Sequence, residues 1–172
     1  MKKISINSIV KIGMIAAIYV VTTMALAPIS YGEIQFRLSE VLVLLAFIHP
    51  MYIPGLVIGC VLANLSSPLG VIDITVGSFA TFLSVMCIHF TKVKLGFNLK
   101  SLKIAAMWPV IFNGILVGTM LYYLIGIPLI VSIISVAIGE FVVVRILGVV
   151  IFKSLIKNKR LMDILNLDKL NS

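Results

Sequence analysis

The chain has 172 residues, of which 61% are hydrophobic and only 12% are charged, and its mean hydropathy is +1.21. This composition excludes a water-soluble domain and is typical of a chain that crosses a membrane several times. The formal net charge of +8 is explained by lysines that flank membrane spans on the cytoplasmic side, and we expect no nucleic-acid partner.

The first apolar stretch, residues 8–28, is interpreted as a membrane span. Its start resembles a signal peptide, because a basic beginning leads through an apolar run to Ala25-Leu26-Ala27. Lys11 interrupts the early part of that run, and Pro28 directly after the Ala-x-Ala makes a poor cleavage context. We therefore expect this segment to remain in the mature protein.

The second apolar stretch, residues 38–65, is either one tilted helix or two short ones. As one helix its 28 residues would be about 42 Å long. Pro50 and Pro54 each lack an amide donor and Gly55 adds flexibility, so the local chemistry favours a break. We predict two short spans, over residues 38–49 and 50–65.

Three further spans are predicted over residues 72–91, 104–125 and 128–152, followed by an amphipathic, basic tail over 153–172 on the inner leaflet. Six spans with a cytoplasmic N-terminus place every basic residue except Arg37 and Arg145 on the inner side, in agreement with the positive-inside rule. The predicted fold is an all-α bundle of six transmembrane helices, forming one integral membrane domain over 1–172 with both termini in the cytoplasm.

The polar residues of this otherwise apolar chain gather on the predicted external side. The external loops and outer span ends contain Glu33, Gln35, Arg37, Glu40, Asn64 and Asp73. Asn113 and Glu140 lie near the middle of the last two spans. A charge at that depth costs roughly 2.5–3.5 kcal/mol on insertion scales, so such a residue is by default a functional hypothesis. These eight residues are the candidate substrate-binding site.

Structural roles are the alternative for most of these residues. Arg37 and Glu40 could pair with each other at the i, i+3 spacing of a helix start. Asp73 could cap the N-terminus of its helix, and Asn64 could cap the end of the span before it. Asn113 could hold two helices together by a hydrogen bond. Glu140 needs a partner from a neighbouring helix or from a ligand.

Small residues at four-residue spacing indicate close helix contacts. Gly55/Gly59 and Gly114/Gly118 are expected to pack within the bundle. Gly13 and Ala17 lie near the inner face, where they could contact a partner helix.

No P-loop, nucleophile elbow or metal-ligand array occurs in the sequence, and Cys60 and Cys87 are interpreted as buried apolar residues. We predict a binding subunit with no enzyme activity, cofactor or metal, which depends on a partner for energy.

The run APISYGEIQFRLSEVL, followed by HPMYIPGLVIGCVLANLSSPLGVIDITVGS, resembles the QueT family of queuosine-precursor transporters. The resemblance covers residues 8–152 and is strongest over 27–78. It implies the six-helix fold of a substrate-binding S component of an energy-coupling factor (ECF) transporter in the cell membrane. It also implies a T component and two ATPase subunits as partners, with Gly13 and Ala17 at the T-component contact.

The substrate that the resemblance implies is a 7-deazaguanine such as preQ1 or preQ0. Its N–H edge suits a carboxylate, its exocyclic oxygen needs a donor such as Asn113 or Gln35, and the cationic aminomethyl group of preQ1 needs a second carboxylate. Glu140 and Asp73 are the first choices for the carboxylates and Glu40 the third, and residues 28–42 are interpreted as a lid. The alternatives are an S component for another vitamin-like ring, a self-sufficient proton-coupled secondary transporter that uses Glu140, and a structural membrane protein.

Overall fold

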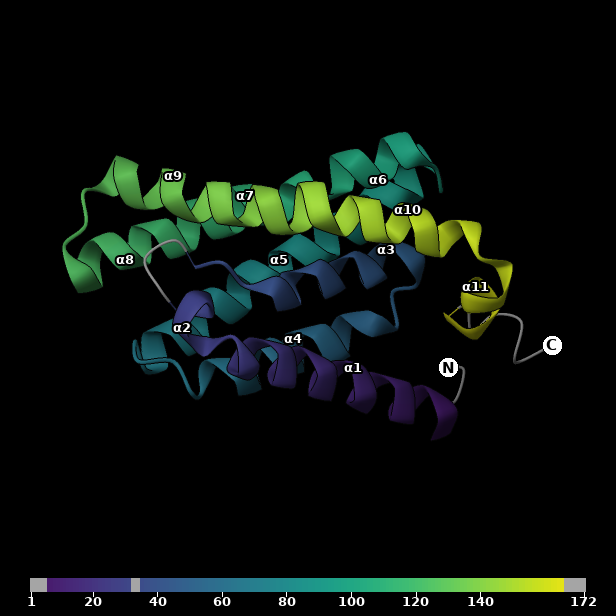
Figure 1. Ribbon diagram of the computed structural model, residues 1–172, viewed down its shortest axis with the longest axis horizontal. Helices are drawn as coiled ribbons and strands as arrows, with labels where there is room; N and C mark the ends of the chain where they lie inside the picture. The colour runs from purple at the N-terminus through teal and green to yellow at the C-terminus, as the bar shows by residue number, and fades with distance from the viewer. Residues whose placement is uncertain (1–5, 32–34, 166–172) are drawn as a thin grey trace.

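The computed structural model of the chain describes residues 6–31 and 35–165, and the described part contains helices and short connections but no strand (Figure 1). The prediction of an all-α membrane protein is confirmed. Within residues 6–31 and 35–165, four helical stretches are long and apolar enough to cross a membrane. These are α1 (Ile6–Ala25), α5 (Val71–Leu95), residues Leu99–Ile125 and residues Leu129–Lys157.

The last two of these long helices are composite. The stretch from Leu99 consists of α6 (Leu99–Ala105), α7 (Met107–Phe112), the π-helical segment η2 (Asn113–Val117) and α8 (Gly118–Ile125). The stretch from Leu129 consists of α9 (Leu129–Glu140), the π-helical segment η3 (Phe141–Gly148) and α10 (Val149–Lys157). This final helix continues into the predicted tail, where α11 (Lys159–Leu165) follows it.

The stretch between residues 38 and 65 is broken at 49–51, where the prolines predicted a break. Before the break lie the 3₁₀ helix η1 (Leu38–Leu44) and α3 (Leu45–Ile48), and after it lies α4 (Tyr52–Asn64). A 3₁₀ helix rises about 2.0 Å per residue, so η1 and α3 together reach about 20 Å. Both halves are therefore shorter than a full span, and crossing of the membrane by these two segments stays a prediction.

The first predicted span also ends earlier than expected. The helix α1 ends at Ala25, and a separate turn, α2 (Ala27–Ser30), contains Pro28. In Figure 1 this turn lies away from the start of α1, beside the end of α4 and the start of α5. It therefore brings the chain back over the bundle towards η1.

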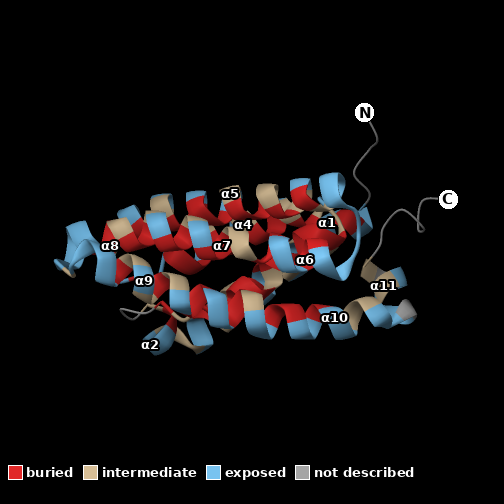
Figure 2. Ribbon diagram, turned by 90° about the horizontal axis from the view of Figure 1, so that it is seen from above, coloured by how far each residue is buried: buried red, intermediate tan, exposed pale blue. Residues whose placement is uncertain are grey.

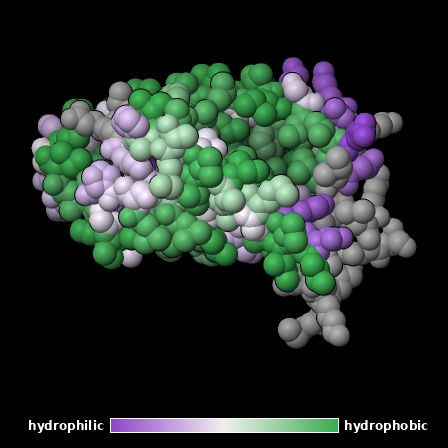
Figure 3. Space-filling view, turned by 60° about the horizontal axis from the view of Figure 1, so that its bottom comes forward, coloured by the Kyte–Doolittle hydropathy of each residue, from purple (hydrophilic) through white to green (hydrophobic). Residues whose placement is uncertain are grey.

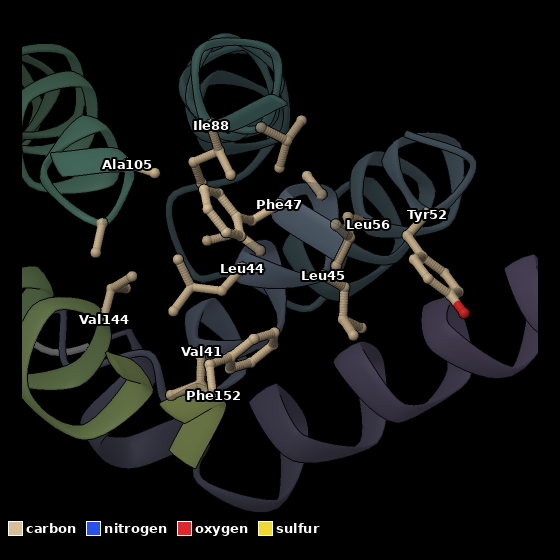
Figure 4. Close-up of a cluster of buried hydrophobic side chains, with 14 of the residues drawn as sticks. Val41, Leu44, Leu45, Phe47, Tyr52, Leu56, Ile88, Ala105, Val144 and Phe152 are labelled. Carbon is tan, nitrogen blue, oxygen red and sulfur yellow. The ribbon is translucent and has the colours of Figure 1, made fainter. Parts of the chain in front are cut away.

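The core lies where η1 and α3 are enclosed by the longer helices (Figure 4). Leu44 and Phe47 are fully buried there, in contact with a cluster that includes Leu56 of α4, Ile88 of α5 and Phe152 of α10. Burial follows the facing sides of the helices, and the outward sides are exposed (Figure 2). Because the exposed residues include many large apolar side chains, the outer surface is suited to lipid.

Glycines allow the closest helix contacts, as their spacing predicts. A Cβ on Gly55 would lie 2.6 Å from the carbonyl oxygen of Ile12, and one on Gly59 would lie 2.8 Å from the Cβ of Tyr19. α4 thus packs directly on the backbone of α1. Gly118 similarly lies against Ile133 of α9.

The two ends of the molecule differ in charge. Strongly hydrophilic side chains gather at one end in Figure 3, which is the end where α6, α10 and α11 lie in Figure 1. The described basic residues of these helices and of the end of α5 are Lys92, Lys94, Lys100, Lys103, Lys153, Lys157 and Arg160. The start of α1 lies at the same end. The assignment of this end to the cytoplasm stays a prediction from the positive-inside rule.

Candidate functional site

A buried ion pair joins the loop before η1 to the start of α5. Nη2 of Arg37 lies 3.0 Å and 3.2 Å from the two carboxylate oxygens of Asp73, and Nε of Arg37 donates to the carbonyl of Ser30 at 3.4 Å. The guanidinium also lies 5.6 Å from the centre of the Tyr31 ring. The local alternatives were therefore wrong: Arg37 pairs with Asp73 and not with Glu40, and the N-cap of α5 is Gly70.

The charge on Arg37 is maintained by its surroundings. Burial alone would lower the pKa of the guanidinium, but the adjacent carboxylate of Asp73 raises it, and the net direction is upwards. The pair therefore fixes a permanent positive charge beside a carboxylate, where the two partners neutralise each other.

Asn64 supports the same pair from α4. Its Nδ2 donates to the backbone carbonyl of Asp73 at 3.1 Å and lies 3.5 Å from the sulfur of Cys60. Gly77, one helical turn after Asp73, leaves the space that these side chains occupy. A Cβ at Gly77 would lie 2.8 Å from Nδ2 of Asn64 and 3.0 Å from a carboxylate oxygen of Asp73.

Replacing Gly77 by alanine is expected to destabilise the protein by about 1–3 kcal/mol, because the added methyl group overpacks a buried polar contact. The midpoint of thermal unfolding in detergent measures this effect. Gly13→Ala is the matched control, since nothing lies within 4 Å of a Cβ built there. Equal midpoints for the two variants would contradict the packing seen around Asn64.

Glu40 is the carboxylate at the centre of a second buried group. Its Oε1 accepts hydrogen bonds from the hydroxyl of Tyr19 and, at 3.1 Å, from the hydroxyl of Thr81, which also lies 3.3 Å from the sulfur of Cys60. Tyr19 and Thr81 are fully buried. The sequence analysis missed these two residues, because a tyrosine and a threonine in apolar helices give no signal except their place on the buried face.

Glu140 and Asn113 form the third group, between the last two long helices. Nδ2 of Asn113 donates to Oε1 of Glu140 at 3.0 Å, so the glutamate does find a partner on a neighbouring helix. The helix η1, which contains Glu40, packs against η3, which begins directly after Glu140, so the second and third groups lie on adjoining elements. A π-helical segment begins at Asn113 and another directly after Glu140. Such segments are frequent at functional sites.

Several polar atoms of this region are buried and have no hydrogen-bond partner among the described residues. Glu40 and Glu140 each have one such carboxylate oxygen, Oε2. The others in this region are Oγ of Ser30, Nε2 of Gln35, Oδ1 of Asn64 and Oγ of Ser78. Buried polar groups are normally paired, so a cluster of unpaired ones requires an explanation. Oε2 of an ionised Glu40 or Glu140 and Oδ1 of Asn64 accept hydrogen bonds, and Nε2 of Gln35 donates them, as a polar heterocycle requires.

Gln35 stands out through its backbone as well. Its φ of 49° lies in the left-handed region, and its side chain is buried next to the Arg37 loop. A non-glycine residue pays for this conformation, and such strain is concentrated at ligand contacts. Glu33, the remaining predicted site residue, lies outside the described residues.

Two predicted residues lie away from this site. Gly13 and Ala17 are exposed on α1, and Gly13 has open space beside it. Within the described residues, no three His, Cys, Asp or Glu side chains come together as metal ligands would.

Comparison with known proteins gives a consistent result. A family model described as the QueT transporter matches residues 9–157. A queuosine precursor transporter QueT from Lactococcus lactis subsp. cremoris (strain MG1363) is 44% identical over 98 residues, which are 55% of this chain and 57% of that relative. The alignment thus spans little more than half of the relative's length. No solved structure matches the chain.

Proposed function

The chain belongs to the QueT transporter family, and from this premise we propose that it is the substrate-binding subunit for uptake of a queuosine precursor. The substrate would be a 7-deazaguanine such as preQ1 or preQ0. Transport across the cell membrane agrees with the transporter family to which the chain belongs and with its several helices that are long enough to span a membrane. One observation supports this site for the substrate: Glu40 and Glu140 are buried, and each has one carboxylate oxygen that accepts a hydrogen bond from the protein and one without a partner among the described residues.

The free carboxylate oxygens match the hydrogen-bond donors of a deazaguanine. One carboxylate would accept from the N–H groups of the base edge, and the other would accept from the aminomethyl group of preQ1. Nε2 of Gln35, a donor without a partner, suits the exocyclic oxygen. Because Glu40 and Glu140 both retain a free oxygen, they are the preferred pair, in place of Glu140 and Asp73.

Asp73 then has a positioning role. Both of its carboxylate oxygens lie at the Arg37 guanidinium, so they are already engaged by a full charge. Through their hydrogen bonds, Arg37, Asn64 and Asp73 hold the loop before η1 against the end of α4 and the start of α5. In this assignment they shape the site, Asn113 orients Glu140, and Glu33 and its neighbours before η1 close over the substrate as a lid. Residues 38–42 of the predicted lid belong instead to the largely buried helix η1.

Energy for uptake would come from partners, an ECF T component and two ATPase subunits. The sequence has no P-loop of its own. The exposed Gly13 and Ala17 support a partner contact on α1, because small residues let a second helix approach closely and no part of the described chain fills the space beside Gly13.

Replacing Gly13 by leucine is expected to leave the isolated chain folded and to prevent co-purification with the T component and the ATPases. The larger side chain would fill the surface where a partner helix approaches. Pull-down from cells that express the complete transporter measures this, with thermal unfolding of the isolated subunit as the control. Gly13→Ala should retain the complex. A Gly13→Leu variant that assembles as well as the original chain would contradict a contact at this position.

The proposal is tested by calorimetric titration of the purified chain with preQ1, preQ0, queuine, guanine and riboflavin. Tight binding of a deazaguanine alone is the expected result. Binding of riboflavin or another ring instead would retain a binding subunit but refute the substrate. If the chain binds none of them and, alone in vesicles, supports uptake that depends on a proton gradient and not on ATP, it is a secondary transporter.

A further inference from the structure

A groove with a basic rim runs between α6 and the helix formed by η3 and α10. Its volume is about 300 Å³, and its lining consists of Leu99, Lys103, Arg145, Ile146, Val149, Val150 and Lys153. A smaller hollow of about 160 Å³ adjoins it at Leu99 and Lys153 and is lined further by Phe97, Asn98, Ile156 and Lys157. The two hollows together form one continuous groove. Its apolar floor includes Ile146, Val149 and Val150, and its basic rim consists of Lys103, Arg145, Lys153 and Lys157.

The charges of this groove have no counter-charge among the described residues that line it. None of the lining residues is acidic. Lys103, Arg145 and Lys153 make no ion pair with any described residue. Basic side chains that converge without a carboxylate are an electrostatic site for an anion.

The position of Arg145 in its helix is a second reason to expect an anion in the groove. Arg145 lies eight positions before Lys153, at the inner end of the predicted span, which corresponds to about 12 Å along a helix. That distance places the backbone of Arg145 inside the hydrocarbon of a bilayer about 30 Å thick. An arginine at such depth is costly unless its guanidinium meets an anion or reaches the interface.

The apolar floor identifies the kind of anion. Val150 and Ile146 are 62% and 51% exposed, and they lie in the groove together with Val149. In a membrane-spanning helix these side chains face acyl chains, while the lysines lie at the end of the span, at the level of the headgroups. A free inorganic anion would bind the basic side chains of the rim but would leave the apolar floor without a partner.

We propose that this groove is a binding site for an anionic phospholipid such as phosphatidylglycerol. The phosphate lies between Lys103, Arg145 and Lys153, and one acyl chain follows the apolar floor along α10. Basic pockets between transmembrane helices recognise anionic headgroups in this way. The site is separate from the buried carboxylates, and the proposal depends on the membrane location of the chain and not on its substrate.

Native mass spectrometry of the chain, equilibrated in detergent with phosphatidylglycerol or phosphatidylcholine, tests the proposal. The wild-type chain should retain phosphatidylglycerol in preference. The double variant Lys103→Gln/Arg145→Gln should bind it more weakly, by roughly fivefold for each basic side chain removed. Lys100→Gln/Arg160→Gln is the matched control, because it removes one lysine and one arginine at the same end of the protein but outside the groove lining.

A second variant separates the groove from charge alone. Val150→Trp fills the floor without changing any charge and should also reduce retention of phosphatidylglycerol. Equal losses in the groove variant and its matched control would overturn the proposal in favour of diffuse attraction. Displacement of the lipid by soluble glycerol phosphate, or unchanged retention in Val150→Trp, would also overturn it, because the acyl chain would then contribute nothing.

Discussion

Replacing Glu140 by glutamine is expected to weaken binding of a 7-deazaguanine by about 2 kcal/mol, or roughly thirtyfold. The change leaves the shape of the side chain intact, and the amide oxygen still accepts the hydrogen bond from Asn113. What is lost is the free carboxylate oxygen, the acceptor of a charge-assisted bond from the ligand. The dissociation constant from calorimetric titration measures the loss.

The matched control for this variant is Asp163→Asn, which removes one carboxylate from the exposed surface of α11. It should bind the ligand as the original chain does. Without ligand, thermal unfolding of Glu140→Gln should occur at the original midpoint or above it, since burial of a charged group costs free energy. Full binding by Glu140→Gln would show that this carboxylate does not contact the substrate.

Replacing Asp73 by asparagine is expected to have the largest effect on stability, a loss of about 3–5 kcal/mol. Arg37 is only 5% exposed, so the variant leaves its charge buried opposite a neutral amide. The midpoint of thermal unfolding in detergent should fall strongly, and substrate binding should fall with it because the loop before η1 loses its anchor on α5.

The double variant Arg37→Met/Asp73→Asn distinguishes the ion pair from the space that it fills. Removal of both charges should recover much of the stability lost in Asp73→Asn, because no charge then remains unpaired in the interior. A double-mutant cycle reports the coupling between the two residues. Purely additive losses would mean that Arg37 and Asp73 do not interact as the structure indicates.

Much of the fold follows from local features of the sequence. The break at residues 49–51 contains Pro50, which cannot donate a backbone hydrogen bond, whereas Pro54 is accommodated in the first turn of α4. The contact of α4 with α1 comes from Gly55 and Gly59 at one-turn spacing. Burial of Glu140 with Asn113 follows from the cost of a polar group in the middle of a span. These inferences succeed because each follows from the residues of one short segment and from whether that segment lies in lipid or in water.

The partners within the site could not be predicted in the same way. Arg37 has an acidic neighbour one turn away, and the local rule pointed to Glu40, whereas the fold brings Asp73 from the next long helix. Tyr19 lies on α1 and meets Glu40 only because α1 and η1 pack together. The π-helical segments at Asn113 and after Glu140 likewise depend on packing between the last two helices. Side-chain partners that lie far apart in the chain are decided by tertiary structure.

The ion pair between Arg37 and Asp73 also has a consequence for biosynthesis. The two residues flank the segment that contains η1, α3 and α4, and both of its halves are too short to be read as ordinary spans. Arg37 leaves the ribosome first and has no partner until the beginning of α5 has been synthesised. The ion pair can therefore form only after the beginning of α5 has been synthesised, so that α5 is the element that completes the packing of the segment between the two residues.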